Sequence, residues 1–241
     1  MIATMLVSCS SSYNITGTIT SASLQSYDGD MVYLRMLGTE EGTTVNSCKV
    51  LHGDFKMSGP VDSVICVKMY FGQSGDYIPI IIEEGEIKVS ALTNAMKVEG
   101  TPLNDKFYAF MTERDSLMFL LDELPRKENA MISYGYDNDE ILRMLGEEEG
   151  MLRIAVDQLE TEFVMDNYDN VLGITYFLML CDNIRDQFGF FKTTPQIKKL
   201  YNNAPEEFKR NRNVEEYMRS CDKQTGGTED CNAGEMEKAT E

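Results

Sequence analysis

The spacing of hydrophobic residues changes near Gly100, and no other feature of the sequence constrains the fold as strongly. Before this point Val, Ile, Thr, Tyr and Gly recur at the short spacing of strands, and after it Leu, Met, Glu, Asp and Lys recur at helical spacing. A chain of 241 residues can bury one large core or two modest ones. The sequence therefore predicts an α+β protein, with a β domain over residues 13–100 and a helical domain over residues 101–222.

Short segments of the first half are β-branched or aromatic and are separated by Gly, Asp or Asn. The predicted strands are Tyr13–Thr20, Met31–Met36, Val45–Leu51, Phe55–Met57, Ser63–Phe71, Pro79–Glu83 and Glu86–Ser90. Such spacing is typical of an antiparallel β-sandwich or a partly open barrel. His52-Gly53 and Glu84-Gly85 are predicted hairpin turns, because Gly adopts a positive φ at little cost. His52 is the only histidine, and we interpret it as a turn residue rather than as a catalytic base.

The second half begins with a helix signal, in which Thr101 is the predicted N-cap and Pro102 the first helical residue. Apolar residues from Leu103 to Leu124 share one face, which predicts a helix that needs a packing partner. Val171–Cys181 is apolar on nearly every side, yet its eleven residues fall short of the roughly 20 that cross a bilayer. This segment is therefore predicted to be a buried central helix.

Acidic runs lie between the other helical segments. The run Gly146–Gly150 separates the apolar stretches Ile141–Leu145 and Met151–Met165, and is predicted to be a solvated break between helices. Asp137–Asp139 and Asp166–Asn170 precede apolar runs and lack the alternating ligand spacing of a calcium loop. Helix capping is the preferred interpretation of both runs over metal binding.

The net charge of −18 limits the partners of this protein. Residues 1–100 contain 6 basic and 11 acidic residues, and residues 101–241 contain 16 and 29. No basic stripe is present that could displace counterions from phosphate, so the sequence predicts no nucleic acid partner. An anionic bilayer would also repel the chain, and a membrane location would need a covalent anchor.

The segment Leu6-Val7-Ser8-Cys9 resembles the lipobox of bacterial lipoproteins, in which the cysteine receives diacylglycerol. Ser10–Ser12 after it suits a flexible tether, so residues 1–12 are predicted to be a truncated lipoprotein signal and tether with lipid on Cys9. Met1–Val7 has no basic residue and barely an apolar core, which predicts a true start codon upstream. The alternative is that Met1–Val7 forms a first strand and Cys9 is a buried thiol.

Periodicity ends after the predicted helices Pro195–Tyr201 and Pro205–Cys221, so residues 223–241 are predicted to be a disordered acidic tail. Cys221 and Cys231 flank a Gly-containing stretch there, and a disulfide between them is one option. A zinc site would need four close ligands, which this region does not offer.

The bonding state of the other cysteines, Cys48, Cys66 and Cys181, stays open. Neither a cofactor nor a metal site is predicted.

Three runs carry a resemblance to a known family: Asn46–Phe55, Ile82–Val89 and Val98–Asn104. They look like an uncharacterised β domain, the domain of unknown function DUF 4369, which is found near the N-terminus of many Gram-negative lipoproteins. In those proteins it precedes a helical segment and then a thioredoxin-like domain of the AhpC/TSA or thiol:disulfide interchange type. The chain contains no Cys-x-x-Cys, so we expect that thioredoxin-like domain to be absent here. The resemblance implies a fold and carries over no catalytic residue.

The sequence thus predicts a lipid-anchored, non-catalytic binding or accessory module of a Gram-negative cell envelope. We expect it to be held on the outer or inner membrane, to face the periplasm or the surface, and to bind an unknown protein or small molecule. The alternative is a component of a thiol-disulfide redox system, with Cys66 or the pair Cys221 and Cys231 as redox groups. A glycosidase is a weaker option. Among 40 acidic residues, pairs of carboxylates occur by chance and are no sign of a catalytic site, and the chain has no Trp that could stack on sugars.

Overall fold

The computed structural model describes residues 11–20, 27–36, 43–72, 75, 77–92 and 95–233. The chain divides into two compact units, unit 1 (Met1–Met111) and unit 2 (Thr112–Glu241). The division falls within helix α1 (Pro102–Asp122), so the start of this helix belongs to the β unit and the remainder to the helical unit. The predicted boundary at residue 100 marks the change from strands to helices.

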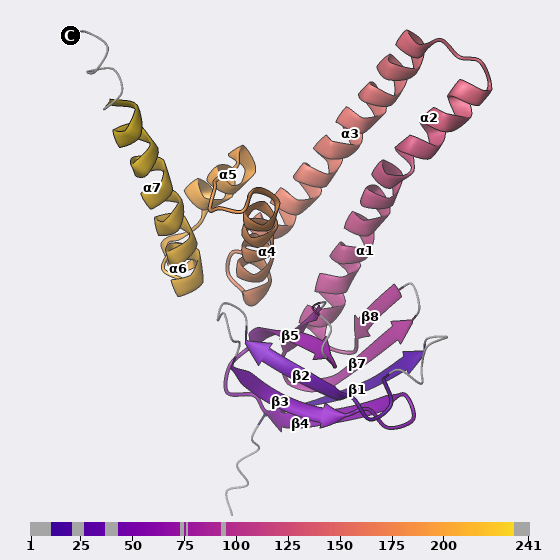
Figure 1. The fold of residues 1–241 in the computed structure, drawn as a ribbon. Coiled ribbons are helices and arrows are strands. Elements are labelled where there is room, and N and C mark those ends of the chain that lie inside the picture. The colour runs from indigo at the N-terminus through magenta and orange to yellow at the C-terminus, as the bar shows by residue number, and fades with distance from the viewer. Residues whose placement is uncertain are drawn as a thin grey trace, which may run out of the picture. The chain divides into compact units, whose positions relative to one another are not determined.

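The strands of unit 1 form two four-stranded sheets (Figure 1). They are β1 (Ser12–Thr20), β2 (Met31–Met36), β3 (Thr44–Lys49), β4 (Asp54–Pro60), β5 (Ile65–Phe71), β6 (Tyr77–Ile82), β7 (Gly85–Leu92) and β8 (Ala95–Glu99). One sheet has the strand order β4-β1-β7-β8 and the other β3-β2-β5-β6. Buried side chains from both sheets form one hydrophobic core, so the predicted α+β class with an N-terminal sandwich is confirmed.

Alternation along each strand explains which residues form this core. Val32 and Leu34 of β2 are fully buried, whereas Tyr33 between them and Arg35 after them are half-buried on the outer face. Successive side chains of a strand point to opposite faces, so a strand with this pattern covers the core on one side only.

The pairing of the strands differs from the prediction in two respects. β1 pairs in parallel with β7, while the other pairs are antiparallel, and β8 was not predicted from its sequence. Ala and Lys have low strand propensity, and β8 forms because its backbone pairs with β7. Pairing between strands that are distant in the chain cannot be predicted from the residues next to each strand in the sequence.

The two predicted hairpin turns have different outcomes. His52 (φ 55°) and Gly53 (φ 86°) form a tight turn in which Leu51 and Asp54 exchange backbone hydrogen bonds, so this turn is confirmed. Gly85 also has a positive φ of 130°, but β6 and β7 on either side belong to different sheets. The prediction of a hairpin there was wrong, because a positive φ reverses the chain without deciding which strand pairs with which.

Helix α1 begins at Pro102 as predicted, but a residue distant in sequence caps it. The backbone amides of Leu103 and Asn104 donate to the carboxylate of Glu83, over 2.8 and 3.1 Å. The Thr101 hydroxyl instead accepts from the side-chain amide of Asn104, over 2.8 Å. Thr101 occupies the predicted N-cap position, where its carbonyl accepts from the amide of Asp105. Its hydroxyl does not cap the helix, because the buried Glu83 carboxylate takes the amides that the hydroxyl would have satisfied.

Asn104 fixes the same junction from the helix side. Its side chain is fully buried, accepts from the amide of Ile81 over 3.0 Å and donates to the carbonyl of Ile81 over 2.7 Å. The Tyr108 hydroxyl, one turn further on, donates to the carbonyl of Pro79. The start of α1 is thereby bonded to β6, which gives its apolar face the packing partner that the sequence required.

Unit 2 contains the rest of α1 and six further helices among the described residues. These are α2 (Leu124–Ser133), α3 (Asn138–Met165), α4 (Val171–Phe188), α5 (Pro195–Asn203), α6 (Glu206–Lys209) and α7 (Arg212–Ala233). α4 holds the largest share of buried residues named for these helices, which agrees with the predicted buried central helix. Asp137 and Asn170 cap α3 and α4 by accepting from backbone amides two residues on, so both capping predictions are confirmed.

The predicted break at Gly146–Gly150 was wrong, because α3 is continuous through it. Glu is a good helix former, and the three glutamates of the run are paired with cations. Arg143 pairs with Glu147 and Arg153 pairs with Glu149, each four residues apart on α3. Glu148 pairs with Lys127 of α2, so the acidic run contributes to the contact between these helices.

A buried polar cluster on α3 joins several parts of unit 2. The carboxylate of Glu160 accepts from Arg114 Nε (2.7 Å), from the Tyr176 hydroxyl (2.7 Å) and from Gln196 Nε2 (3.2 Å). Burial raises the pKa of Tyr176 well above its ordinary value, and the charge of Glu160 raises it further. The phenol therefore stays protonated and donates, and the cluster is a structural link rather than a reactive centre.

Candidate functional site

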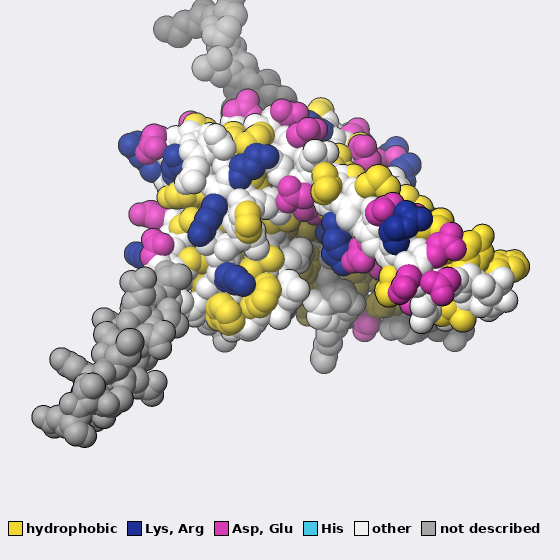
Figure 2. All heavy atoms as spheres, turned by 90° about the horizontal axis from the view of Figure 1, so that it is seen from above, with side chains coloured by type: hydrophobic (Ala, Val, Ile, Leu, Met, Phe, Trp, Pro, Cys, Tyr) yellow, Lys and Arg dark blue, Asp and Glu magenta, His cyan; other side chains and the backbone are white. Residues whose placement is uncertain are grey.

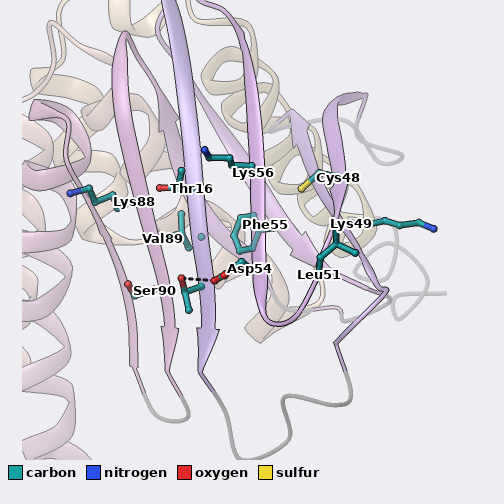
Figure 3. Close-up of a pocket in the computed structure, with 12 residues that line it drawn as sticks. Thr16, Cys48, Lys49, Leu51, Asp54, Phe55, Lys56, Lys88, Val89 and Ser90 are labelled. Carbon is teal, nitrogen blue, oxygen red and sulfur yellow. Dashed lines mark hydrogen bonds between the residues drawn. The ribbon is translucent and has the colours of Figure 1, made fainter.

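A groove of about 810 Å³ lies against three neighbouring strands of unit 1, β4, β1 and β7, and the end of β3 (Figure 3). It is lined by Thr16, Gly17, Thr18, Cys48, Lys49, Leu51, Asp54, Phe55, Lys56, Lys88, Val89 and Ser90. All of these residues belong to unit 1. The groove is open to solvent, so a ligand could enter it without a movement of the fold.

The register of the three strands aligns the lining residues in rows across the sheet. The rows are Lys56–Thr16–Lys88, Phe55–Gly17–Val89 and Asp54–Thr18–Ser90. Phe55 and Val89 point into the core, and the polar rows on either side of them point outward. A polar surface with cations at one level and hydroxyls beside them is thus built from residues about 35 positions apart in the chain.

The centre of the groove depends on the absence of a side chain at Gly17. A Cβ atom at Gly17 would lie 1.9 Å from Cζ of Phe55, so the ring occupies the space that any other residue would need. The Phe55 ring in turn packs edge-on against Phe71 of the opposite sheet, with ring centroids 5.6 Å apart. The groove floor is therefore held by the core of the sandwich.

The groove is positively charged in an otherwise acidic chain. Lys56 and Lys88 line it on either side of Thr16, and Asp54 is its only carboxylate among the described residues. Lys49 also borders the groove, but its side chain extends away from the other two lysines (Figure 3). Asp54 accepts a hydrogen bond of 3.0 Å from the Thr18 hydroxyl. None of the three lysines has a carboxylate within ion-pair distance in the described part of the chain. Their ammonium groups are exposed and available to an anion.

Three of the described cysteines, Cys48, Cys181 and Cys221, have the character of packing residues. Burial raises the pKa of Cys48 at the groove wall, although the backbone amide of Lys56 partly opposes this shift. Burial is also the main cause of the raised pKa values of Cys181 and Cys221 in unit 2. A thiol with a raised pKa is protonated at neutral pH and is a poor nucleophile, which does not favour thiol exchange at these three positions.

The residues proposed as sites from the sequence lie elsewhere. Cys9 lies outside the described residues, so the structure says nothing of it. Cys221 and Cys231 both lie in helix α7, which continues past residue 222 to Ala233 instead of ending in a loop. Ten residues of α-helix span about 15 Å, more than the roughly 7 Å that a disulfide allows between Cα atoms. The helix therefore keeps the two cysteines too far apart, and the Cys221–Cys231 disulfide is not formed in this structure.

Helix α7 extends further than its sequence predicts because adding a residue to an existing helix costs little once the first turns are packed. Val214 and Tyr217 of α7 are buried and provide that packing. Residues 234–241 of the predicted acidic tail lie outside the described residues.

Two kinds of site are absent from the described part of the chain, a metal site and a membrane span. In these ranges no group of three or more His, Cys, Asp or Glu side chains is placed to hold a metal ion. None of the described helices is long and apolar enough to span a bilayer.

The comparison with protein families identifies the unit that carries the groove. The family model of a domain of unknown function, DUF4369, matches residues 13–107. This segment is a DUF4369 domain. The DUF4369 domain thus includes the strands of both sheets, the groove and the start of α1. Searches among curated proteins and among solved structures found no match to the chain.

Proposed function

We propose that this protein is a non-catalytic binding module of a Gram-negative cell envelope, and that the groove of its DUF4369 domain takes an anionic ligand. The observation that carries the proposal is the pair of exposed lysines Lys56 and Lys88 on either side of Thr16, beside hydroxyl groups and a single carboxylate. Lysine is a point charge with three donors, and it binds phosphate or carboxylate groups without demanding one geometry.

Binding rather than catalysis fits the chemical content of the groove. Asp54 has no second carboxylate beside it in the groove, and Cys48 is a protonated thiol at neutral pH. His52 lies in the exposed turn after β3, where its backbone amide donates to Asp28, and it does not line the groove. A general base paired with a nucleophile would need groups of this kind within hydrogen-bond reach of each other.

The groove is tested by titrating the protein with citrate and with inorganic phosphate while its backbone amides are followed by NMR. We expect saturable shifts at Thr16, Lys56 and Lys88 that weaken as salt is added, because exposed charges are screened. The variant K56E/K88E should lose about tenfold or more in affinity, since each charged hydrogen bond contributes about 1.5 kcal/mol or more.

K199E/K223E is the matched control, because it reverses two exposed lysines of unit 2, which contributes no residue to the groove. If K199E/K223E weakens binding as much as K56E/K88E, the effect is one of net charge, and the groove is not the site. NMR shift changes at residues outside β1, β4 and β7 would also refute the groove as the binding site.

We propose that Cys9 carries the lipid that holds this module on a membrane. The lipobox-like Leu6-Val7-Ser8-Cys9 and the serines after it support this, as does the net charge of −18, which gives no electrostatic attraction to an anionic bilayer. Expression of the gene with its upstream codons in a Gram-negative host, with a clickable palmitate analogue, should label the wild type and Cys48→Ala. Cys9→Ala should neither label nor sediment with membranes, and labelling of Cys9→Ala would contradict the proposal.

A further inference from the structure

The outer face of the second sheet, β3-β2-β5-β6, carries a row of three tyrosines. Tyr33 of β2 lies opposite Tyr70 of β5, and Tyr70 lies opposite Tyr77 of β6. Their sequence neighbours, such as Val32 and Met69, are buried in the core, so the three rings point away from it. The rings of Tyr70 and Tyr77 are 5.7 Å apart between centroids, and all three side chains are half-buried.

Two cations lie in the next row of the same face. Arg35 and Lys68 are opposite each other on β2 and β5. The guanidinium carbon of Arg35 lies 5.3 Å from the ring centroid of Tyr33 and 5.2 Å from that of Tyr70. Lys68 Nζ lies 4.2 Å from the ring centroid of Tyr77. Cation–π contacts of this kind orient the cations against the tyrosine rings.

The charges of these two cations are not neutralised by the described residues. Neither Arg35 nor Lys68 has a carboxylate within ion-pair distance there. Arg35 Nε is shielded from solvent and has no hydrogen-bond acceptor. The positive charges of Arg35 and Lys68, which no described carboxylate neutralises, leave this face with capacity for an outside anion. Such an anion would contact the terminal nitrogens of the guanidinium group, because Nε is shielded.

We propose that this tyrosine–cation face, made of Tyr33, Arg35, Lys68, Tyr70 and Tyr77, binds an acidic oligosaccharide. Neighbouring strands are about 4.8 Å apart, so three tyrosines in a row offer successive sugar rings one aromatic surface each. Carboxylate groups on the sugars pair with Arg35 and Lys68, which accounts for the cations among the rings. The site uses other residues than the lysine groove, so it stands whether or not the groove binds an anion.

A single-stranded nucleic acid would also combine stacking with negative charge, but the charge balance argues against it. Such a strand carries one phosphate at every nucleotide and is bound through grooves rich in Lys and Arg. This face offers two cations, and the whole chain would repel a dense polyanion. Sparse negative charge on a ring-rich chain matches the face better.

The test is calorimetric titration of the full chain with a hyaluronan tetrasaccharide, which carries a carboxylate on every second ring. Maltotetraose is the neutral counterpart and oligo-deoxythymidine is the nucleic acid. We expect saturable binding of the hyaluronan tetrasaccharide, and binding of maltotetraose that is at least about tenfold weaker, because the charged contacts are missing. R35Q and K68Q should each lower the affinity for the hyaluronan tetrasaccharide by about tenfold, and Tyr70→Leu should lower the affinity for both sugars.

Lys97→Gln, which removes an exposed charge from the other sheet, should leave binding unchanged. Circular dichroism and thermal unfolding of each variant show whether the fold is retained, and R35Q alone is decisive if Tyr70→Leu does not fold. Equal affinity for the hyaluronan tetrasaccharide and maltotetraose, tighter binding of oligo-deoxythymidine, or an unchanged affinity in R35Q and K68Q would each overturn the proposal.

Discussion

Replacing Glu160 by alanine is expected to destabilise unit 2 by about 3–5 kcal/mol, the cost of removing one partner from a buried ion pair. The Glu160 side chain is 7% exposed and that of Arg114 is 20% exposed. Alanine would leave the largely desolvated Arg114 guanidinium with only the exposed carboxylate of Asp115, 3.6 Å away, as an acidic partner. The hydroxyl of Tyr176, which is 2% exposed as a residue, would lose its acceptor as well.

Glu162→Ala is the matched control for this change. Glu162 lies on the same helix and is exposed, so its loss should change the free energy of unfolding by no more than about 0.5 kcal/mol. Urea unfolding followed by circular dichroism measures both variants. The double variant R114M/E160L should recover part of the lost stability, because no charge is then buried alone. A loss in E160A no larger than in E162A would mean that the cluster does not hold the helices together.

The parts of the fold that the sequence predicted correctly depend on neighbours in the chain. The Asp137 and Asn170 caps bond to amides two residues on, and the His52-Gly53 turn is closed by the residues on either side of it. The errors arose where a distant residue decides the outcome. Glu83 displaces the Thr101 hydroxyl as the cap of α1, and Lys127 pairs with Glu148 in the run that was interpreted as a break.

The candidate groove could not be predicted from the sequence, for the same reason. Lys56, Thr16 and Lys88 form one row because β1 pairs with β4 on one side and, in parallel, with β7 on the other. Each of these residues alone is an ordinary polar position on an alternating strand. A search for polar residues at alternate positions could have marked them as outward-facing, but the register that brings them together follows from pairing across the whole domain.

The resemblance to DUF4369 proteins has a physical explanation at the junction of β6 and α1. Two of its runs, Ile82–Val89 and Val98–Asn104, meet there through the bonds of Glu83 and Asn104. Gly100, in the second run, lies against the backbone of Glu86 in the first. The motif residues therefore fix where the first helix leaves the sandwich, which is a role in folding rather than in chemistry.

Gly100→Ala is accordingly expected to destabilise unit 1 by about 3 kcal/mol or more. Gly100 has φ +106°, and a Cβ atom there would lie 2.3 Å from the carbonyl oxygen of Glu86, a backbone atom that cannot rotate away. A left-handed conformation costs alanine about 1–2 kcal/mol, and overpacking adds about 1–3 kcal/mol. The backbone amide of Gly100 also donates to Asp105 in the first turn of α1, over 2.8 Å, so a shift of Gly100 loosens the helix start.

Gly29→Ala separates the two causes, because Gly29 has a similar φ of +88° but nothing within 4 Å of its added Cβ. Its cost should be that of the left-handed conformation alone, about 1–2 kcal/mol. The midpoint temperature of thermal unfolding of unit 1 should then fall by about 12 °C or more in G100A, because 1 kcal/mol shifts the midpoint of a domain of this size by about 4–8 °C. The fall in G29A should be smaller, about one to two thirds of that in G100A. Equal losses in the two variants would show that backbone strain alone governs the junction, and that the close approach of Gly100 to Glu86 does not hold α1 on the sandwich.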